Sequence, residues 1–255
     1  FERAQACMKY VLMVHGCPEE KAEKTAHEMA RNSLEGVYTH GINRFSRLIR
    51  NIQEGIVRPE AEPAVEGRFG AMEQINGNLG LGVVNAWFAM GEAIRLAEEY
   101  GIGLAALKNT DHWMGAATCG YQACEAGMAG ICFTNTIPNM PTWGAEDSRI
   151  GNNPLVFAFP REGGHLIADM AMSQFSYGAL ELARLEGRQM PIDAGFDLQG
   201  KLTKDPDAVI RSQRILPTGY WKGAALSFML DVFAAGLSSG NTVSDVGKLP
   251  GDEHG

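Results

Sequence analysis

The first residues that could do chemistry are His40 and Arg44, in the string Thr-His-Gly-Ile-Asn-Arg at residues 39–44. They are four residues apart, so they would share a face if both lay in one helix. An imidazole can donate a proton near neutral pH, and a guanidinium can bind a carboxylate through two hydrogen bonds. The pair therefore suits an α-keto or α-hydroxy acid. The alternative is an ordinary surface pair at the start of a helix.

A second candidate is His112, in the string Asn-Thr-Asp-His-Trp-Met-Gly at residues 109–115. It follows directly on an apolar segment that predicts a strand at residues 102–107, and ligands of α/β domains lie at the carboxyl ends of strands. Gly115 and Gly120 would let a following helix approach a ligand closely. A structural histidine is the alternative.

A carboxylate and a lysine could complete the same site. Asp169 ends an apolar strand expected at residues 166–170, where an unpaired carboxylate is costly to bury. Lys222, in Gly-Tyr-Trp-Lys-Gly at residues 219–223, opens an apolar helix, and a helix N-terminus with an ammonium group suits a phosphate. The alternatives are an N-cap for the segment from Ser173 and a solvated lysine.

These residues give two histidines, an arginine, a carboxylate and a lysine. The set fits carbonyl reduction with a bound nucleotide, and it also fits a metal-dependent hydrolase that uses His40, His112 and Asp169. The sequence has no G-x-G-x-x-G turn after a strand, no Walker A loop, no G-x-S-x-G elbow and no H-E-x-x-H pair. Any cofactor site is therefore built differently, and spacing alone leaves both chemistries open.

The hydrophobic pattern predicts the elements that position these residues. A long loop at residues 135–154, rich in amides, prolines and glycines, is typical of a binding wall or a dimer contact. Apolar runs between helices indicate buried sheet in an α/β domain. Helices are expected at residues 1–16, 19–34, 39–54, 83–100, 115–126, 178–187 and 222–237, and strands at residues 69–75, 102–107, 129–134, 155–159 and 166–170.

Composition excludes several classes of protein. The 255 residues are 45% hydrophobic and 20% charged, which is typical of a globular domain and not of a collagen-like or disordered chain. No apolar stretch approaches the ~18 residues of a membrane span. The net charge of −8 argues against nucleic acid and anionic membranes as partners. No CxxC pair occurs, and reduced cytoplasmic thiols are expected at Cys7, Cys17, Cys119, Cys124 and Cys132.

Six blocks in order resemble the malate/L-lactate dehydrogenase family that lacks a Rossmann fold, at residues 39–45, 109–114, 130–132, 149–155, 169–173 and 219–223. Strings at residues 175–178, 195–197 and 202–204 are similar to its 2,3-diketo-L-gulonate reductase subgroup. The resemblance implies an L-sulfolactate dehydrogenase-like α/β fold, a mixed sheet with flanking helices and a non-Rossmann nicotinamide site. It also implies a cytoplasmic homodimer.

The implied activity is NAD(P)H-dependent reduction of a 2-keto acid, with NAD(H) as cofactor and NADP(H) as the alternative. The subgroup resemblance implies 2,3-diketo-L-gulonate as the substrate, reduced to 3-dehydro-L-gulonate. Malate or L-lactate chemistry and reduction of a cyclic imine acid such as piperideine-2-carboxylate stay open. A metal-dependent hydrolase is less favoured.

The resemblance also implies roles for individual residues. His40 matches the family's proton donor, His112 lines the same pocket and Arg44 faces the substrate, with no metal. Cofactor contacts map onto His165, Leu166, Ile167, Ala168, Asp169, Met170, Ala171, Trp221, Lys222, Gly251, Asp252 and Glu253.

Three departures from the family pattern affect these expectations. Residues 115–117 read Gly-Ala-Ala where the subgroup has Arg-Gly-Gly, and Asp111 and Cys119 also differ from the usual residues, which leaves the exact substrate open. The family's cofactor-contacting string Leu-Pro-Gly-x-Glu comes directly after Lys248, so we expect residues to be missing between about Asp245 and Leu249.

Two domains are expected. Residues 1–66 would pack with residues 222–255 as a substrate and dimer domain, and residues 67–221 would form the cofactor-binding domain.

Overall fold

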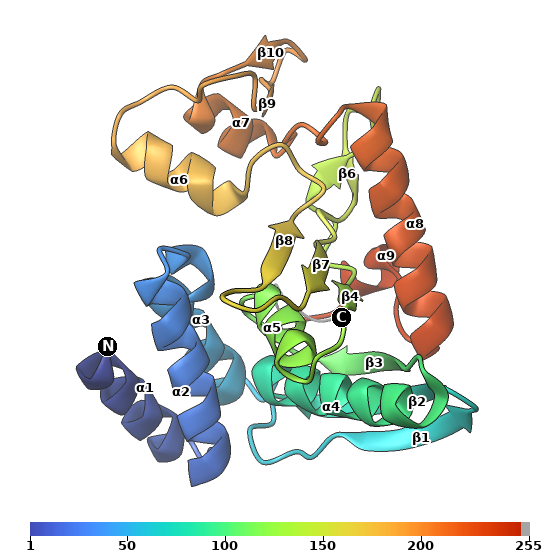
Figure 1. Ribbon diagram of the computed structural model, residues 1–255. Coiled ribbons are helices and arrows are strands. Elements are labelled where there is room, and N and C mark those ends of the chain that lie inside the picture. The colour runs from blue at the N-terminus through green and yellow to red at the C-terminus, as the bar shows by residue number, and fades with distance from the viewer. Residues whose placement is uncertain (251–255) are drawn as a thin grey trace.

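The computed structural model describes residues 1–250. Its N-terminal part is helical and forms a group of its own in Figure 1. Apolar residues at helical spacing, such as Leu12, Ala26 and Met29, are fully buried in one core between these helices. The elements are α1 (Glu2–Val14), α2 (Glu19–Leu34), the 3-10 turn η1 (Tyr38–His40) and α3 (Ile42–Gln53).

The first sheet has the strand order β1-β2-β3 and consists of β1 (Ala64–Phe69), β2 (Met72–Gly80) and β3 (Leu104–Thr110). β1 and β2 are antiparallel, whereas β2 and β3 are parallel. Parallel strands need a crossover connection, which is α4 (Gly82–Tyr100), packed against both strands. This parallel pair places the carboxyl end of β3 directly before His112.

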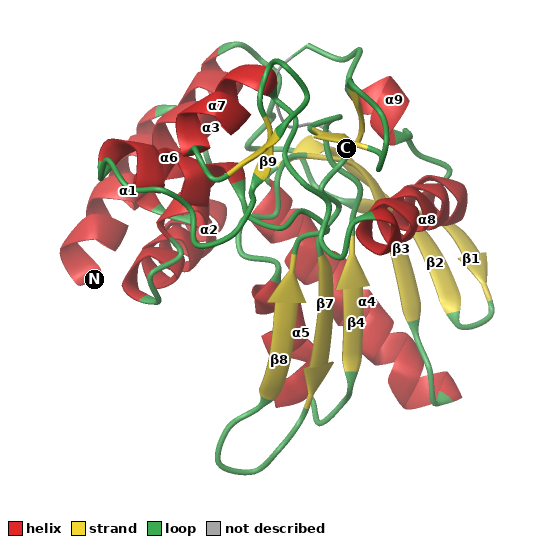
Figure 2. Ribbon diagram, turned by 90° about the horizontal axis from the view of Figure 1, so that it is seen from above, coloured by secondary structure: helices red, strands yellow, loops and turns green. Residues whose placement is uncertain are grey.

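The second sheet is antiparallel, with the order β4-β7-β8. It consists of β4 (Gly130–Phe133), β7 (Leu155–Phe159) and β8 (Leu166–Met170), and α5 (Ala117–Glu125) covers one of its faces, as Figure 2 shows. Val156 and Ala158 are buried toward α5, whereas Ile131 and Phe157 on the opposite face are exposed. The expected buried sheet is therefore buried on one face only.

The rest of the described chain surrounds a further core that contains Met140, Leu180 and Ile215. Its elements are β5 (Met140–Pro141), β6 (Ser148–Ile150), α6 (Tyr177–Leu185), β9 (Gly195–Phe196), β10 (Leu202–Thr203), α7 (Pro206–Ser212), α8 (Trp221–Ser238) and α9 (Val243–Val246). No helix within residues 1–250 is both long and apolar enough to cross a membrane.

Two expected elements are wrong. The single helix at residues 39–54 is interrupted at Gly41, where φ −116° and ψ −134° separate η1 from α3, so Gly41 is the N-cap of α3. A Cβ on Gly41 would overlap Ser33 of α2, which explains the close approach at this break. The single strand at residues 69–75 is a hairpin, because Gly70 turns the chain with a φ of +60°.

The predicted domain boundary after residue 66 falls inside β1. α8 contacts β2, β3 and β6, and Figure 1 draws it on the opposite side of the molecule from α1, α2 and α3. The division into a substrate and dimer domain and a cofactor-binding domain stays a prediction.

Residues 245–249 form one continuous turn, in which the backbone N–H groups of Lys248 and Leu249 donate to the carbonyls of Asp245 and Val246. The expectation that residues are missing between about Asp245 and Leu249 stays a prediction.

Gly82, the first residue of α4, fixes the distance between this helix and the segment that carries His112. A Cβ at this position would overlap the backbone oxygens of Asp111 and His112. We expect Gly82→Ala to lower the free energy of unfolding by about 1–3 kcal/mol, the usual cost of overpacking, as measured by urea denaturation.

Gly91→Ala is the matched control in the same helix. Its Cβ would meet nothing closer than Gln122 Nε2 at 3.8 Å. Since alanine is favoured over glycine by about 1 kcal/mol in a helix interior, this variant should be as stable as the wild type or more so. Equal destabilisation of both variants would contradict the close approach at Gly82.

Candidate active site

The structure brings His40 and His112 together. His40 ends η1 and His112 follows β3, and their rings are stacked with centroids 5.4 Å apart and planes inclined by 30°. The sequence predicts one site for both histidines from two separate motifs. They meet because α2 packs against both η1 and α4. The two imidazoles form the centre of the candidate site.

Two hydrogen-bond partners that the sequence did not predict orient these rings. Met114 donates its backbone N–H to Nδ1 of His112 at 2.9 Å, so this nitrogen is an acceptor and the proton of the neutral ring lies on Nε2. The hydroxyl of Thr39 lies 3.2 Å from Nδ1 of His40. Met114 itself has a backbone φ of +65°, which no residue pattern indicated.

Both histidines are neutral at pH 7 in the free site. Burial and, as the smaller cause, the positive charge of Arg44 together lower the pKa of His40 to about 4. Burial also holds the pKa of His112 well below its usual value, with additional effects of Arg44, His40 and Arg47. His112 therefore offers a fixed N–H donor, and His40 can accept a proton.

Arg44 does not share a helix with His40, contrary to the expected arrangement. It lies on the first turn of α3, after the break at Gly41, yet its charge affects both imidazoles. Arg47, one turn further along α3, affects His112 as well and was not among the expected site residues. Arg47 is three residues from Arg44, so the sequence already indicated that the two side chains share a face of the helix. The two arginines give this site a positive potential that favours an anion.

Asp169 links β8 to the segment after His112. Its Oδ2 accepts the backbone N–H of Ala117 at 3.0 Å, which places a carboxylate at the first residue of α5. Burial raises the pKa of this carboxyl group, and the Ala117 N–H partly offsets the effect. The alternative N-cap for the segment from Ser173 is wrong, because Ser176 caps the next helix, α6.

The carboxyl end of β8 meets the start of α8. Ser173 pairs with Pro217 in an isolated bridge, and the N–H of Thr218 donates to the carbonyl of Met172 at 2.9 Å. Trp221 and Lys222 follow within the first turn of α8 and are exposed. Two of the cofactor segments expected from sequence are thus neighbours in space.

His165 lies apart from this junction, at the other end of β8. Its imidazole Nε2 lies 3.0 Å from Glu125, at the last residue of α5. Gly251, Asp252 and Glu253, also expected to contact the cofactor, lie outside the described residues.

Residues 1–250 contain no group of three or more His, Cys, Asp or Glu side chains placed to hold a metal ion. His40, His112 and Asp169 therefore do not form such a group in the described structure.

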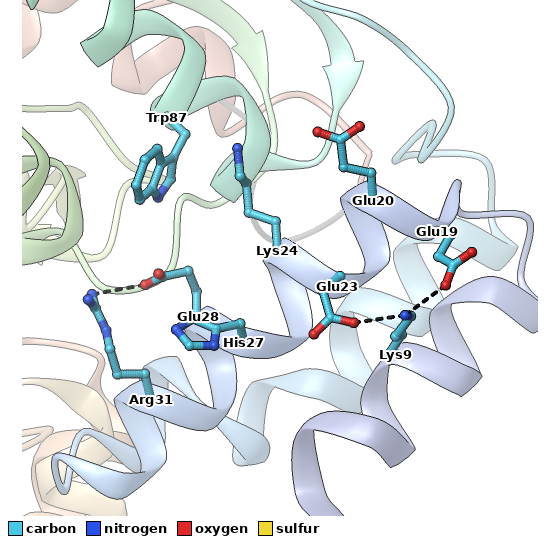
Figure 3. A pocket seen from close by; sticks show the side chains of 9 residues that line it. All are labelled: Lys9, Glu19, Glu20, Glu23, Lys24, His27, Glu28, Arg31 and Trp87. Atoms are coloured by element: carbon cyan, nitrogen blue, oxygen red, sulfur yellow. Dashed lines mark hydrogen bonds and ion pairs between the residues drawn. The ribbon is translucent and has the colours of Figure 1, made fainter. Parts of the chain in front are cut away.

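A separate cavity of about 820 Å³ lies between α1, α2 and α4, and Figure 3 shows the charged residues that line it. Lys9 pairs with Glu19 and Glu23, and Arg31 pairs with Glu28. None of the candidate site residues lines this cavity.

Comparison with known proteins agrees with this geometry. The sequence pattern of the malate/L-lactate dehydrogenase family matches residues 1–255. The chain is 46% identical over its full length to a 2,3-diketo-L-gulonate reductase of Escherichia coli K12, of which it covers 76%.

Solved structures resemble the fold closely. Sulfolactate dehydrogenase from Methanocaldococcus jannaschii matches with a TM-score of 0.90 and 30% identity, over 99% of this chain and 72% of that one. Δ1-piperideine-2-carboxylate reductase from Pseudomonas syringae matches with a TM-score of 0.88 and 29% identity, over 94% of this chain and 73% of that one. The sulfolactate dehydrogenase-like fold is therefore confirmed. The chain belongs to the malate/L-lactate dehydrogenase family and is an oxidoreductase of keto and hydroxy acids.

Proposed function

We propose that this enzyme reduces 2,3-diketo-L-gulonate to 3-dehydro-L-gulonate with NADH. The stacked pair of His40 and His112 beside Arg44 is the observation that carries the chemistry. The 46% identity to a 2,3-diketo-L-gulonate reductase supports the choice of substrate.

The residues divide the reaction between them. Arg44 binds the substrate carboxylate, and Nε2–H of His112 donates to an oxygen of the substrate. His40 delivers a proton to the carbonyl oxygen during reduction, and it takes that proton back when the hydroxy acid is oxidised. A nicotinamide, when bound, would supply the hydride that the carbonyl carbon takes up. Oxygen thus gains the proton and carbon gains the hydride, which balances the reduction.

The protonation state of His40 depends on what occupies the site. In the free site it is neutral at pH 7 and ready to act as a base, because its pKa is about 4. A substrate carboxylate bound to Arg44 offsets one of the causes that lower this pKa. Substrate binding therefore raises the pKa of His40, in the direction of the protonated form that reduction needs.

The residues around β8 fit a nicotinamide dinucleotide. β8 is the outer strand of its sheet, so its free backbone edge can form hydrogen bonds to a ligand. Lys222 lies in the first turn of the 18-residue helix α8 and is suited to a phosphate group. We propose that Asp169, Met170, Trp221 and Lys222 hold the cofactor, with NADP(H) as the alternative to NAD(H).

We further propose that the enzyme is a cytoplasmic homodimer. All five cysteines are free, which agrees with a reducing compartment. Five large apolar side chains on α8 are between 42% and 53% exposed, namely Leu226, Phe228, Met229, Val232 and Phe233. Such a contiguous apolar face is typical of a protein interface.

A substrate panel tests the proposed function directly. The assay follows NADH or NADPH absorbance with 2,3-diketo-L-gulonate, oxaloacetate, pyruvate and Δ1-piperideine-2-carboxylate, each with and without a chelator. We expect the highest kcat/KM for 2,3-diketo-L-gulonate with NADH, unaffected by the chelator. A higher value for another substrate would replace the proposal with that activity, and loss of activity with the chelator would favour a metal-dependent enzyme.

His40→Gln removes the group that moves the proton. We expect kcat to fall by a factor on the order of 10²–10⁴, the usual contribution of a general acid or base, while binding of NADH, measured by fluorescence, is retained. His27→Gln is the control, since His27 lines the separate charged cavity. A near-normal kcat in His40→Gln would disprove the role of this residue.

The charge of Arg44 should be visible in the titration of His40. NMR of the imidazole Cε1–H should give a pKa of about 4 in the free enzyme. Arg44→Gln should raise this pKa, though not to the usual value of about 6.5, because burial is the larger cause. Arg50→Gln, two turns further along α3, should leave it unchanged. A wild-type pKa near 6.5 would show that His40 is solvated.

A further inference from the structure

Asn32 of α2 contacts both segments that carry the stacked histidines. Its side chain is 3% exposed, and its amide Nδ2 donates to the backbone carbonyl of His40 at 3.1 Å. Its own backbone carbonyl accepts the N–H of Val37 at 2.8 Å. Residue 32 therefore holds the turn that leads to His40 at two points.

The opposite side of the same amide touches the segment after His112. A Cβ on Gly115 would lie 2.9 Å from Asn32 Nδ2 and would overlap Oδ1, so the Gly115 backbone lies directly against this side chain. Gly115 follows Met114, whose N–H holds Nδ1 of His112. The side-chain amide of Asn32 thus lies between the backbone segment of His40 and the backbone segment that follows His112.

Neighbouring residues of α2 fix the helix that follows Gly115. Arg31 Nη2 donates to Thr118 Oγ1 at 2.8 Å, and this hydroxyl donates to Glu28 Oε2 at 2.9 Å. Figure 3 shows the ion pair between Glu28 and Arg31 on the same face of α2. Because α5 is tied to α2 here, Gly115 cannot move away from Asn32 without breaking these bonds.

We propose that Asn32 is a positioning residue that sets the stacking and the burial of His40 and His112. An apolar residue at this place would leave the carbonyl of His40 without its donor. A carboxylate would set an acceptor against that carbonyl. Asparagine fits the same space, donates an N–H to the carbonyl of His40 and carries no charge. The proposal rests on the proposed function for its kinetic effect, and on geometry alone for the orientation of the rings.

Asn32→Leu tests the donor at nearly constant shape. We expect kcat to fall by roughly tenfold to a hundredfold, since small misplacements of reacting groups have effects of this size. The affinity for NADH should stay as in the wild type. The pKa of His40, measured by NMR, should rise from about 4 toward its usual value as the ring becomes solvated. A folded variant with unchanged kcat and unchanged pKa would overturn the proposal.

Asn51→Leu is the matched control, because Asn51 is another buried asparagine of the helical part and its Nδ2 makes no hydrogen bond within the described structure. It should change neither the pKa of His40 nor kcat. An equal effect of both variants would show a general loss of packing and would also overturn the proposal.

Gly115→Ala approaches the amide from the other side and tests the proposal even if Asn32→Leu does not fold. It should raise the pKa of His40 and lower kcat. In a double variant with Asn32→Ala the two changes should be less than additive, because both disturb the same contact. Fully additive changes would contradict the contact. The NMR titration does not depend on turnover, so failure of the proposed reaction and failure of the positioning role are distinguishable.

Discussion

Burial of two neutral imidazoles beside positive charge is the constraint on which the candidate site depends. The transfer of a charged imidazole out of water is costly, and Arg44 adds repulsion, so both rings are held in the uncharged form. A neutral imidazole has one donor and one acceptor, and each must be assigned. The N–H of Met114 makes this assignment for His112. The site therefore has a defined polarity before any ligand binds.

Close backbone approaches maintain this arrangement. α2 lies against the His40 turn at Gly41 and against the His112 segment at Gly115, and α4 lies against the latter at Gly82. A Cβ at any of these three positions would overlap the neighbouring segment. The helical part of the chain is thus a rigid support for the two histidines, and its packed core resists deformation.

The cofactor side of the site is organised by backbone pairing. Residues 172–174, just after β8, bond to residues 216–218, just before α8. Asp169 ties β8 in turn to the start of α5, close behind the His112 segment. Proton-transferring groups and the proposed cofactor segments therefore belong to one connected framework, although they are spread over most of the chain.

The sequence by itself determined the family, the extents of the long helices and of β7 and β8, and the identity of His40, His112 and Arg44 as candidates. Helical periodicity and short apolar runs are local signals, and a family motif is read residue by residue. Tertiary structure alone decided the break at Gly41, the hairpin at Gly70 and the placement of Asn32 between the two histidine segments. These depend on close approach between segments distant in sequence, and no local pattern encodes such distances. The low pKa values of both histidines likewise arise from burial, which only the folded chain creates.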